Sequence, residues 1–226
     1  MKSKKDIPMI VLMSATAVAV LVTGILYRQP FFRMIPLFVS LFVGALQSRA
    51  NRHAALIGGI NSILYAIVFF TIGIYASAVY ALAFSFPVQL VTFILWSKNK
   101  YKSTTHFKKL SGRARLLIAL AFTVVTVGVI FLLDKVGSLY SVVDSVSSML
   151  GILVSLLTML AYVEYTYLMI PSGVIGGILC AMTMRNDPGQ ITYVIFSVYS
   201  LICVTKAYFS VKKFYAEENS HKENAQ

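Results

Sequence analysis

Charged side chains are scarce in this sequence. Only 12% of the 226 residues are charged, and Asp and Glu together number 8, whereas a soluble domain carries about 25% charged residues. The charges gather at 1–6, 47–53, 97–115 and 209–226, with long uncharged runs between them. Mean hydropathy is +0.78. Because about 20 apolar residues cross the hydrocarbon core as a helix, the pattern excludes a soluble globular domain and predicts a polytopic α-helical membrane protein.

Cysteine and histidine are also rare. Cys180 and Cys203 lie in apolar runs without metal-ligand spacing, and His53, His106 and His221 are scattered over expected loops and the tail. A membrane enzyme such as a lipid phosphotransferase needs clustered Asp, His or Arg at the interface. We therefore expect no enzyme, no catalytic residues, no metal and no cofactor.

The net charge of +12 raises the question of a nucleic-acid partner. The Lys and Arg residues lie mostly at the ends of the apolar runs, where the positive-inside bias places them. We therefore expect membrane lipids, and no nucleic acid, as partners of these charges.

Eight apolar runs predict eight membrane-spanning helices. They lie near 7–27, 32–47, 54–73, 75–96, 116–133, 137–161, 165–184 and 189–211. The first run follows MKSKKD, as a signal peptide would, but it is long and no small-x-small cleavage site precedes Arg28, so we expect a retained helix. Eight helices of about 20 residues leave no room for a soluble catalytic domain.

Basic residues are distributed unequally between the two expected sides. The loops and tail on one side hold most of them, whereas the other side holds only Arg28, Arg33, Lys135 and Arg185. This asymmetry predicts that both termini are cytoplasmic, in a cell inner or plasma membrane.

An internal repeat is visible at an offset of 115 residues. LFVSLFVGALQ (37–47) and ILVSLLTMLAY (152–162) share Val-Ser-Leu, and the same offset pairs Ile63 with Ile178 and Phe93 with Tyr208. One helix between two triplets restores their parallel direction. The sequence thus predicts an all-α membrane protein with one leading helix and a 3+1+3 parallel-repeat bundle, and a substrate site between the repeats near the midplane.

This layout divides the chain into five segments. We expect a leading transmembrane helix at 1–31, a first three-helix repeat at 32–97, a basic cytoplasmic loop with a linker helix at 98–134, a second repeat at 135–213 and a cytoplasmic tail at 214–226.

Gln89 stands in the apolar stretch PVQLVTFILW (87–96). Hydrocarbon offers its amide no hydrogen-bond partner, so Gln89 faces either a solute or a neighbouring helix. Asn61, in GGINSILY, presents the same two alternatives. Phe93 and Trp96 would add an aromatic wall to a site, although Trp96 also suits an interfacial aromatic belt.

Asp144 lies inside an apolar run. An intramembrane carboxylate is costly and is a functional-site candidate by default. The structural alternative is a set of hydrogen bonds to Ser141, Ser147 or Ser148.

These stretches resemble the PnuC family of vitamin transporters. The resemblance rests on GGINSILYAIVFFTIGIYASAVYAL (58–82) and on Gln89 and Trp96, which keep the spacing of that family's Gln-x-x-Gly-Trp-x-x-Trp signature. Thr92 and Phe93 replace the Gly and the first Trp. The resemblance covers roughly residues 32–214.

The second half carries a weaker match. Asp144 corresponds to the aspartate that opens the family's fifth core helix, and Glu164 to the acid of its Glu-Asn-Trp-x-x-Trp signature. Thr166 and Met169 stand where that signature has tryptophans, with Tyr167 nearby. At the inner end of its helix, Glu164 could equally be solvated.

The resemblance implies a SWEET-like 3+1+3 fold that carries a vitamin, riboside or nucleoside, such as nicotinamide riboside, by facilitated diffusion. It also implies trapping of the solute by a separate cytosolic kinase, and a homotrimer. The implied substrate-binding residues are Gln89, Phe93, Trp96, Asn61, Asp144, Tyr167 and Glu164.

We therefore expect a facilitator that takes up a neutral or singly charged vitamin or nucleoside by alternating access. The expected cavity helices carry Gln, Asn, Ser, Thr and Tyr but few charges, which disfavours a phosphorylated solute. The alternative is a substrate-capture subunit of an ATP-driven vitamin importer. Such subunits have six helices without a 3+1+3 repeat, so the repeat favours the facilitator.

Overall fold

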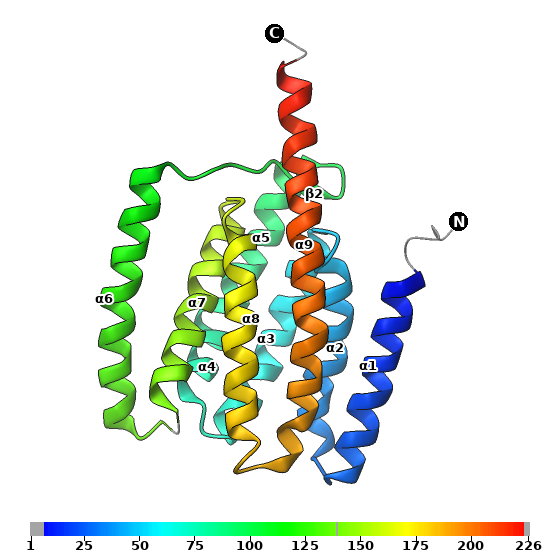
Figure 1. Cartoon of the computed structure of the whole chain (residues 1–226), viewed down its shortest axis with the longest axis vertical. Coiled ribbons are helices and arrows are strands. Elements are labelled where there is room, and N and C mark those ends of the chain that lie inside the picture. Colours follow the sequence, from blue (N-terminus) through cyan, green and yellow to red (C-terminus); the bar gives the residue numbers. More distant parts are fainter. Residues whose placement is uncertain (1–6, 139, 224–226) are drawn as a thin grey trace.

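The computed structural model describes residues 7–138 and 140–223 as a bundle of upright helices (Figure 1). The bundle begins with α1 (Ile7–Leu26), α2 (Phe31–Gln47) and α3 (His53–Thr71). Three segments then continue one another along a single rod: α4 (Tyr75–Val79), the π-helix η2 (Tyr80–Ser85) and α5 (Phe86–Lys98). The chain goes on through β1 (Lys100–Tyr101), β2 (Thr104–Thr105), α6 (Gly112–Val136), α7 (Ser141–Met159), α8 (Tyr165–Thr183), the 3-10 turn η3 (Pro188–Gln190) and α9 (Ile191–Glu223).

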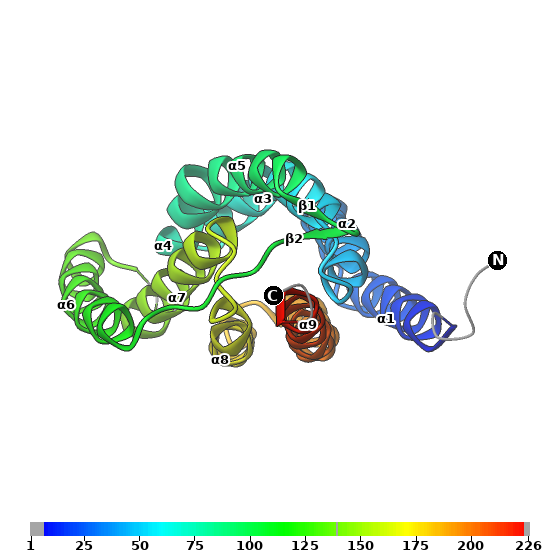
Figure 2. The same cartoon turned by 90° about the horizontal axis from the view of Figure 1, so that it is seen from above.

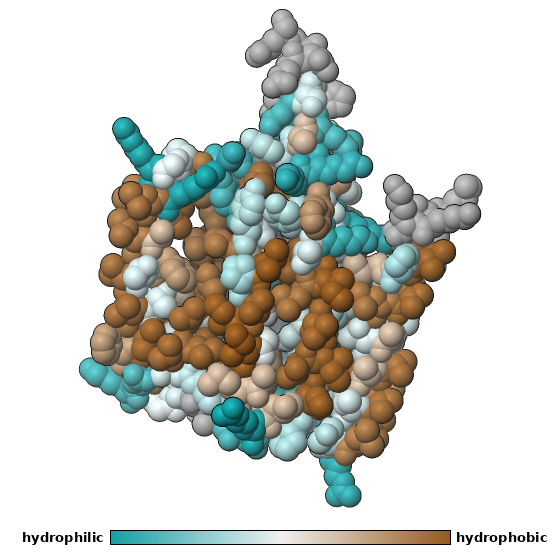
Figure 3. Space-filling view, in the orientation of Figure 1, coloured by the Kyte–Doolittle hydropathy of each residue, from teal (hydrophilic) through white to brown (hydrophobic). Residues whose placement is uncertain are grey.

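The helices have the length and composition of membrane spans. Among the described residues, 7 helical stretches are long and apolar enough to cross a membrane, and α2 is a shorter apolar helix of 17 residues. Figure 3 shows a broad hydrophobic belt on this face, with hydrophilic residues above and below it. The predicted multi-pass, all-helical architecture is confirmed.

The two predicted triplets cross in the same order. In Figure 1, α2 and the α4–α5 rod rise through the bundle while α3 descends, and α7 and α9 rise while α8 descends. α6 descends between the triplets and α1 precedes them. Figure 2 places α1 and α6 at opposite edges of the bundle. The start of α1 and the end of α9 lie on the same side.

Several boundaries differ from the prediction. α6 begins at Gly112 rather than near 116, because the Ser111 hydroxyl accepts a hydrogen bond from Ala114 N (3.3 Å) and caps the helix. We expected Gly137 to open the next helix. Instead it ends α6 in the left-handed conformation, at φ 75°, which glycine adopts without steric cost, and α7 begins at Ser141.

α9 is longer than predicted. We expected the last helix to end at 211, but it continues to Glu223, because the residues after Val211 are rich in Lys, Ala and Glu, which favour helix. The extension is braced by the β1–β2 hairpin: Lys102 Nζ lies 2.7 Å from Glu217 Oε2, a hydrogen bond that raises the pKa of Lys102. Residues 224–226 of the expected tail lie outside the described residues.

The segment between β2 and α6 crosses the upper end of the bundle, as Figure 2 shows from above. On the way it pairs with the α7–α8 turn: Lys108 N donates to Ala161 O (2.8 Å) and Val163 N donates to Lys108 O (2.9 Å). Phe107 packs beneath this segment against Trp96, with ring centroids 5.7 Å apart. The crossing segment is therefore fixed to the second triplet and to the core.

Candidate substrate cavity

A cavity of about 450 Å³ lies between the two triplets. One wall comes from α2, α3, the π-helix and α5, and the other from α7, α8 and α9. The polar lining is made of amides and hydroxyls, including Asn61, Gln89, Ser40, Ser62, Ser85, Thr158, Ser197 and Ser200, and the aromatic lining includes Tyr65, Tyr80, Trp96, Tyr165, Tyr193 and Phe196. No Lys, Arg, His, Asp or Glu occurs among the described residues that line it. The cavity therefore offers neutral hydrogen bonds and ring faces, and no counter-charge.

The offset of 115 residues recurs in this lining. Residues of the first triplet and their counterparts in the second face the same cavity from opposite walls. The pairs are Ser40 and Ser155, Val43 and Thr158, Ala50 and Tyr165, Ala54 and Met169, Gly58 and Gly173, Asn61 and Gly176, Ser62 and Gly177, Tyr65 and Cys180, Ala81 and Phe196, Ser85 and Ser200, and Gln89 and Val204. The first wall carries the amides of Asn61 and Gln89, and the second has Gly176 and Val204 at the corresponding places. The lining is thus paired in position but unequal in chemistry.

Gln89 lies in the cavity wall within a cluster of hydroxyls. Its Nε2 donates to Ser85 Oγ (2.6 Å) and to Ser62 Oγ (3.1 Å). Ser85 precedes Gln89 by one helical turn on the same rod, so the two side chains share a face, whereas Ser62 comes from α3. The Gln89 amide therefore bonds to a neighbouring helix and also lines the cavity.

Two glycines of α3 allow the close approach of α5 that this arrangement needs. A Cβ at Gly58 would lie 2.3 Å from Gln89 Oε1, and a Cβ at Gly59 would lie 3.3 Å from Gln89 Cβ and 3.4 Å from the Phe86 carbonyl oxygen. Any side chain at 58 would displace the amide. The Gly-Gly pair therefore defines where Gln89 sits.

The π-helix brings a further polar contact into the cavity. It ends two residues before Pro87, which lacks the N–H that a regular helix would use at that position. A π turn is a known way to accommodate such a break. Within the π-helix, Tyr80 extends across to the second triplet, where its hydroxyl lies 3.1 Å from Ser155 Oγ. Its ring fits against Gly151, whose Cβ would lie 2.7 Å from the ring.

Asn61 is 2% exposed and lies at the same wall. Its Nδ2 donates to the Pro36 carbonyl (2.9 Å) and to Ser40 Oγ (2.8 Å), both on α2. Its Oδ1 has no hydrogen-bond partner among the described residues. Asn61 thus ties α3 to α2 and leaves a buried acceptor at the cavity wall.

Trp96 lies at the upper end of the cavity and is 4% exposed. Its Nε1 donates to the Thr158 carbonyl (3.0 Å). A tryptophan of an interfacial belt would face lipid, so the structure places Trp96 inside the protein instead.

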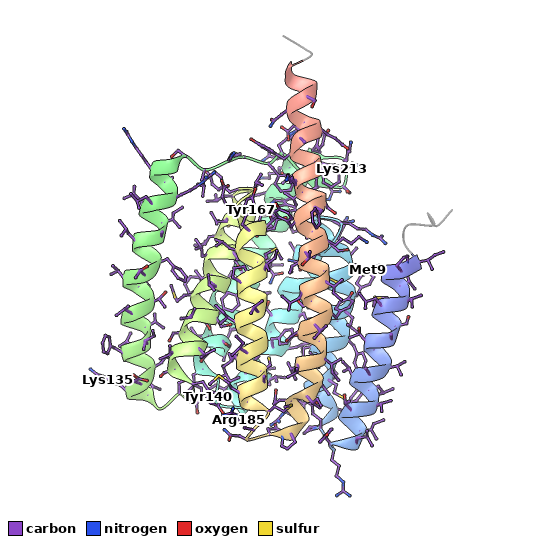
Figure 4. The ribbon with its side chains drawn as sticks, in the orientation of Figure 1. Met9, Lys135, Tyr140, Tyr167, Arg185 and Lys213 are labelled. Carbon is purple, nitrogen blue, oxygen red and sulfur yellow. The ribbon has the colours of Figure 1, made fainter. Side chains whose placement is uncertain are left out.

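Phe93 and Tyr167 are absent from the cavity lining. Phe93 packs on His53, with ring centroids 5.6 Å apart. Tyr167 is 52% exposed, contacts Tyr208 edge-on at 5.3 Å and is labelled on the upper half of α8 in Figure 4. Tyr167 points from the outer face of α8, because it lies two residues from Met169 and thus on the opposite side of the helix. Phe93 follows Gln89 by one helical turn but is directed to His53 of α3.

Asp144 is fully buried, at 0% exposure, but also lies outside the lining. Its carboxylate accepts hydrogen bonds from Ser77 Oγ (2.6 Å), Ala76 N (3.1 Å) and Ser77 N (3.2 Å). Of the hydroxyls expected as structural partners, Ser148 donates to Oδ1 at 3.4 Å, whereas Ser141 bonds to Asp134 instead. The shorter bonds come from the start of α4 in the other triplet. Asp144 therefore joins the two triplets at the lower end of the bundle.

Glu164 lies at the upper end of α8, the end at which we expected it, and is absent from the lining. Its Oε1 accepts from Arg115 Nη2 (2.8 Å) and from Leu110 N (3.1 Å). Its side chain is 12% exposed. Glu164 thus fastens the crossing segment and the start of α6 to α8.

Sequence reasoning missed the serines that surround the two amides. Ser85 could have been found, because it precedes Gln89 by four residues and therefore lies on the same helical face. Ser62 and Ser40 could not, since their contacts depend on how α3 packs against α5 and α2.

Comparison with known proteins identifies relatives of this architecture. A family model described as "Nicotinamide mononucleotide transporter" matches residues 30–211. A solved structure described as "Crystal structure of the Vitamin B3 transporter PnuC" matches with a TM-score of 0.80 at 21% sequence identity, over 96% of this chain and 94% of that chain. No curated protein matches the chain.

Proposed function

We propose, since the chain belongs to the PnuC family of nicotinamide mononucleotide transporters, that this membrane transporter is a facilitator for uptake of a neutral or singly charged vitamin or nucleoside such as nicotinamide riboside. The observation that carries the proposal is the cavity of about 450 Å³ between the triplets, lined by amides, hydroxyls and rings. A pocket of a few hundred Å³ with a small number of convergent polar groups suits one small-molecule ligand.

The lack of charge in the lining favours a solute without a phosphate. A phosphate monoester carries about −1.5 to −2 charges at neutral pH and is bound by Arg, Lys or helix N-termini. No Arg or Lys lines the described cavity, so a mononucleotide would leave its charge uncompensated in a low-dielectric site. A riboside carries the same ring and ribose without that cost.

Three of the expected ligand residues suit this role by position. Gln89 and Asn61 would supply hydrogen bonds and Trp96 an aromatic face, because all three line the cavity. Asp144 and Glu164 accept hydrogen bonds from protein donors outside the lining, and Phe93 and Tyr167 are also absent from it. We therefore assign the proposed binding role to Gln89, Asn61 and Trp96.

The paired lining supports two three-helix repeats, at 32–97 and 135–213, that move against each other around the solute. Parallel repeats with a midplane site are a known transporter architecture in which rocking of the halves gives alternating access. The contacts across the cavity, such as Trp96 with Thr158, would then be made in one state and broken in the other.

Orientation and assembly complete the proposal. Lys213 lies at the upper side and Lys135 and Arg185 at the lower side in Figure 4, and the upper side carries most of the basic residues, so the positive-inside bias favours cytoplasmic termini.

The resemblance to the PnuC family is the basis for proposing a homotrimer and trapping of the solute by a cytosolic kinase. Chemical crosslinking and mass measurement in detergent test the trimer.

Reconstitution into liposomes tests the proposed function. We expect saturable, ATP-independent entry of labelled nicotinamide riboside, and at least about tenfold slower entry of the mononucleotide, which corresponds to about 1.4 kcal/mol. Binding without flux in the absence of an ATPase would favour the capture subunit. A thermal-shift screen against B vitamins, ribosides and nucleosides identifies the ligand, since a bound ligand stabilises the folded state.

A further inference from the structure

The serines around Gln89 determine which end of its amide faces the cavity. Ser62 Oγ donates to the Gly58 carbonyl (3.0 Å), so its only proton is used there. Ser85 Oγ lies 2.7 Å from Ser62 Oγ, in a contact where either hydroxyl could donate. With the Ser62 proton directed to the Gly58 carbonyl, Ser62 accepts in that contact. Ser85 therefore donates to Ser62. Both hydroxyls then have only lone pairs left for Gln89.

This proton order fixes the Gln89 amide. Two hydroxyls that can only accept require a donor, and Nε2 has two hydrogens, one for Ser85 and one for Ser62. With the amide reversed, Oε1 would face Ser62 without a proton between them. The hydrogen-bond network thus holds Nε2 toward the serines and leaves Oε1, which has no protein donor among the described residues, as the free end of the amide.

Asn61 has the same polarity for an independent reason. Both Nδ2 hydrogens go to α2, to the Pro36 carbonyl and to Ser40 Oγ, and Oδ1 is left without a partner. A buried acceptor without a donor is costly, and a ligand donor would relieve that cost. Gln89 and Asn61 thus both have their nitrogens committed to the protein and their oxygens uncommitted.

We infer that Ser62 and Ser85 are positioning residues that turn Gln89 into a hydrogen-bond acceptor only, so that the cavity takes a ligand that presents N–H or O–H donors and rejects the matching carboxylate. The inference rests on the proposed function, because it names the chemical class that the same cavity selects. A primary carboxamide or a hydroxylated ring satisfies the acceptors. At Gln89 Oε1 and Asn61 Oδ1 a carboxylate meets acceptors, and the described lining holds no cation that would offset its charge.

A pair of probes that differ in one group tests this selectivity. Nicotinamide riboside and nicotinic acid riboside share ring and ribose, and differ only in carboxamide against carboxylate. We expect the purified wild-type protein to bind the amide at least about tenfold tighter than the acid. A tenfold ratio of Kd corresponds to the free-energy cost of one unfavourable hydrogen-bond contact.

Serine variants separate positioning from simple contact. In Ser62→Ala the Ser85 hydroxyl loses its acceptor and can donate to Gln89 Oε1, so the amide can turn and offer Nε2 to a carboxylate. The amide-to-acid ratio should then fall to within about threefold. Ser62→Thr keeps the hydroxyl and should keep the wild-type ratio. Thr123→Ala is the control, since Thr123 lies on α6 outside the cavity lining and its hydroxyl donates to the Ala119 carbonyl (3.0 Å) of its own helix. It should leave the ratio unchanged.

The outcomes distinguish the two proposals. A wild-type protein that binds both ribosides equally, or a Ser62→Ala variant that keeps the wild-type ratio, would overturn the inference and leave the proposed function standing. Binding of neither riboside by folded wild-type protein would overturn the proposed substrate class, and the inference with it. Size-exclusion profiles and melting temperatures of each variant show that only folded protein is compared.

Discussion

The indole nitrogen of Trp96 donates a hydrogen bond to the backbone carbonyl of Thr158, 3.0 Å away. This bond joins α5 of the first triplet to the last turn of α7 in the second. It closes the upper end of the cavity, where Phe107 and Tyr165 pack around the same ring at centroid distances of 5.7 and 6.5 Å.

Trp96→Phe should lower stability modestly. The substitution removes the bond but keeps an aromatic ring, and the Thr158 carbonyl still accepts from Ala161 N (3.0 Å). We expect a loss of about 1 kcal/mol, the usual net value of one hydrogen bond, seen as a lower melting temperature in detergent. Phe209→Leu is the control, since Phe209 is 63% exposed, and should leave the melting temperature unchanged. An unaffected Trp96→Phe variant would mean that the bond contributes nothing to stability.

Gly58→Ala should weaken ligand binding with little loss of fold. The added Cβ would lie 2.3 Å from Gln89 Oε1, so the amide must move. We expect at least about a tenfold rise in Kd for nicotinamide riboside, or about 1.4 kcal/mol, measured by isothermal titration. Gly176→Ala lies in the same cavity, but its Cβ would meet nothing closer than Ser147 Oγ at 3.8 Å. Equal loss in both variants would show that bulk in the cavity, and not the position of Gln89, matters.

Asp144→Ala should destabilise the protein without changing the affinity of what folds. It leaves the N–H groups of Ala76 and Ser77 and the Ser77 hydroxyl without their acceptor. Each buried group left unpaired costs about 1–3 kcal/mol, so we expect a large fall in folded yield and melting temperature. Asp134→Ala removes an exposed carboxylate and should cost little. A stable Asp144→Ala protein that has lost affinity for the ligand would show that Asp144 takes part in ligand binding.

Glu164→Ala should release the crossing segment between β2 and α6. The variant removes the acceptor for Leu110 N and the ion pair with Arg115. We expect faster trypsin cleavage after Lys108 and Lys109, followed by mass spectrometry, with ligand affinity unchanged. Glu164→Gln keeps an acceptor for Leu110 N and should be cleaved at an intermediate rate. A cleavage rate equal to that of the wild type would show that the pairing of Lys108 with the α7–α8 turn is sufficient.

The helices could be predicted because hydropathy and length are local properties. Most of the predicted spans end within a few residues of the observed helices. The π-helix at Tyr80–Ser85 was missed, since its sequence is as apolar as its neighbours and only Pro87 hints at a break. The extension of α9 was missed because polar residues after Val211 were taken as a tail, although they favour helix.

The candidate site was also predictable in part, because some of its residues stand out locally in the sequence. An amide in an apolar run is conspicuous, so Gln89 and Asn61 were found, but the sequence does not fix the rotation of each helix. Phe93 and Tyr167 were therefore placed at the site although they point away from the cavity. Asp144 was recognised as exceptional, but its partners at Ala76 and Ser77 are distant in sequence and depend on the packing of α7 against α4.

The most direct test of the account uses Trp96 as a reporter. It is the single tryptophan of the chain and lines the cavity, so a ligand that enters should change its emission. We predict a saturable change on titration of purified protein with nicotinamide riboside, and a Kd at least about tenfold higher in Gln89→Ala, or about 1.4 kcal/mol, at an equal yield of folded protein. A wild-type emission that does not respond, or a Gln89→Ala protein that folds normally and binds as tightly as the wild type, would contradict the account.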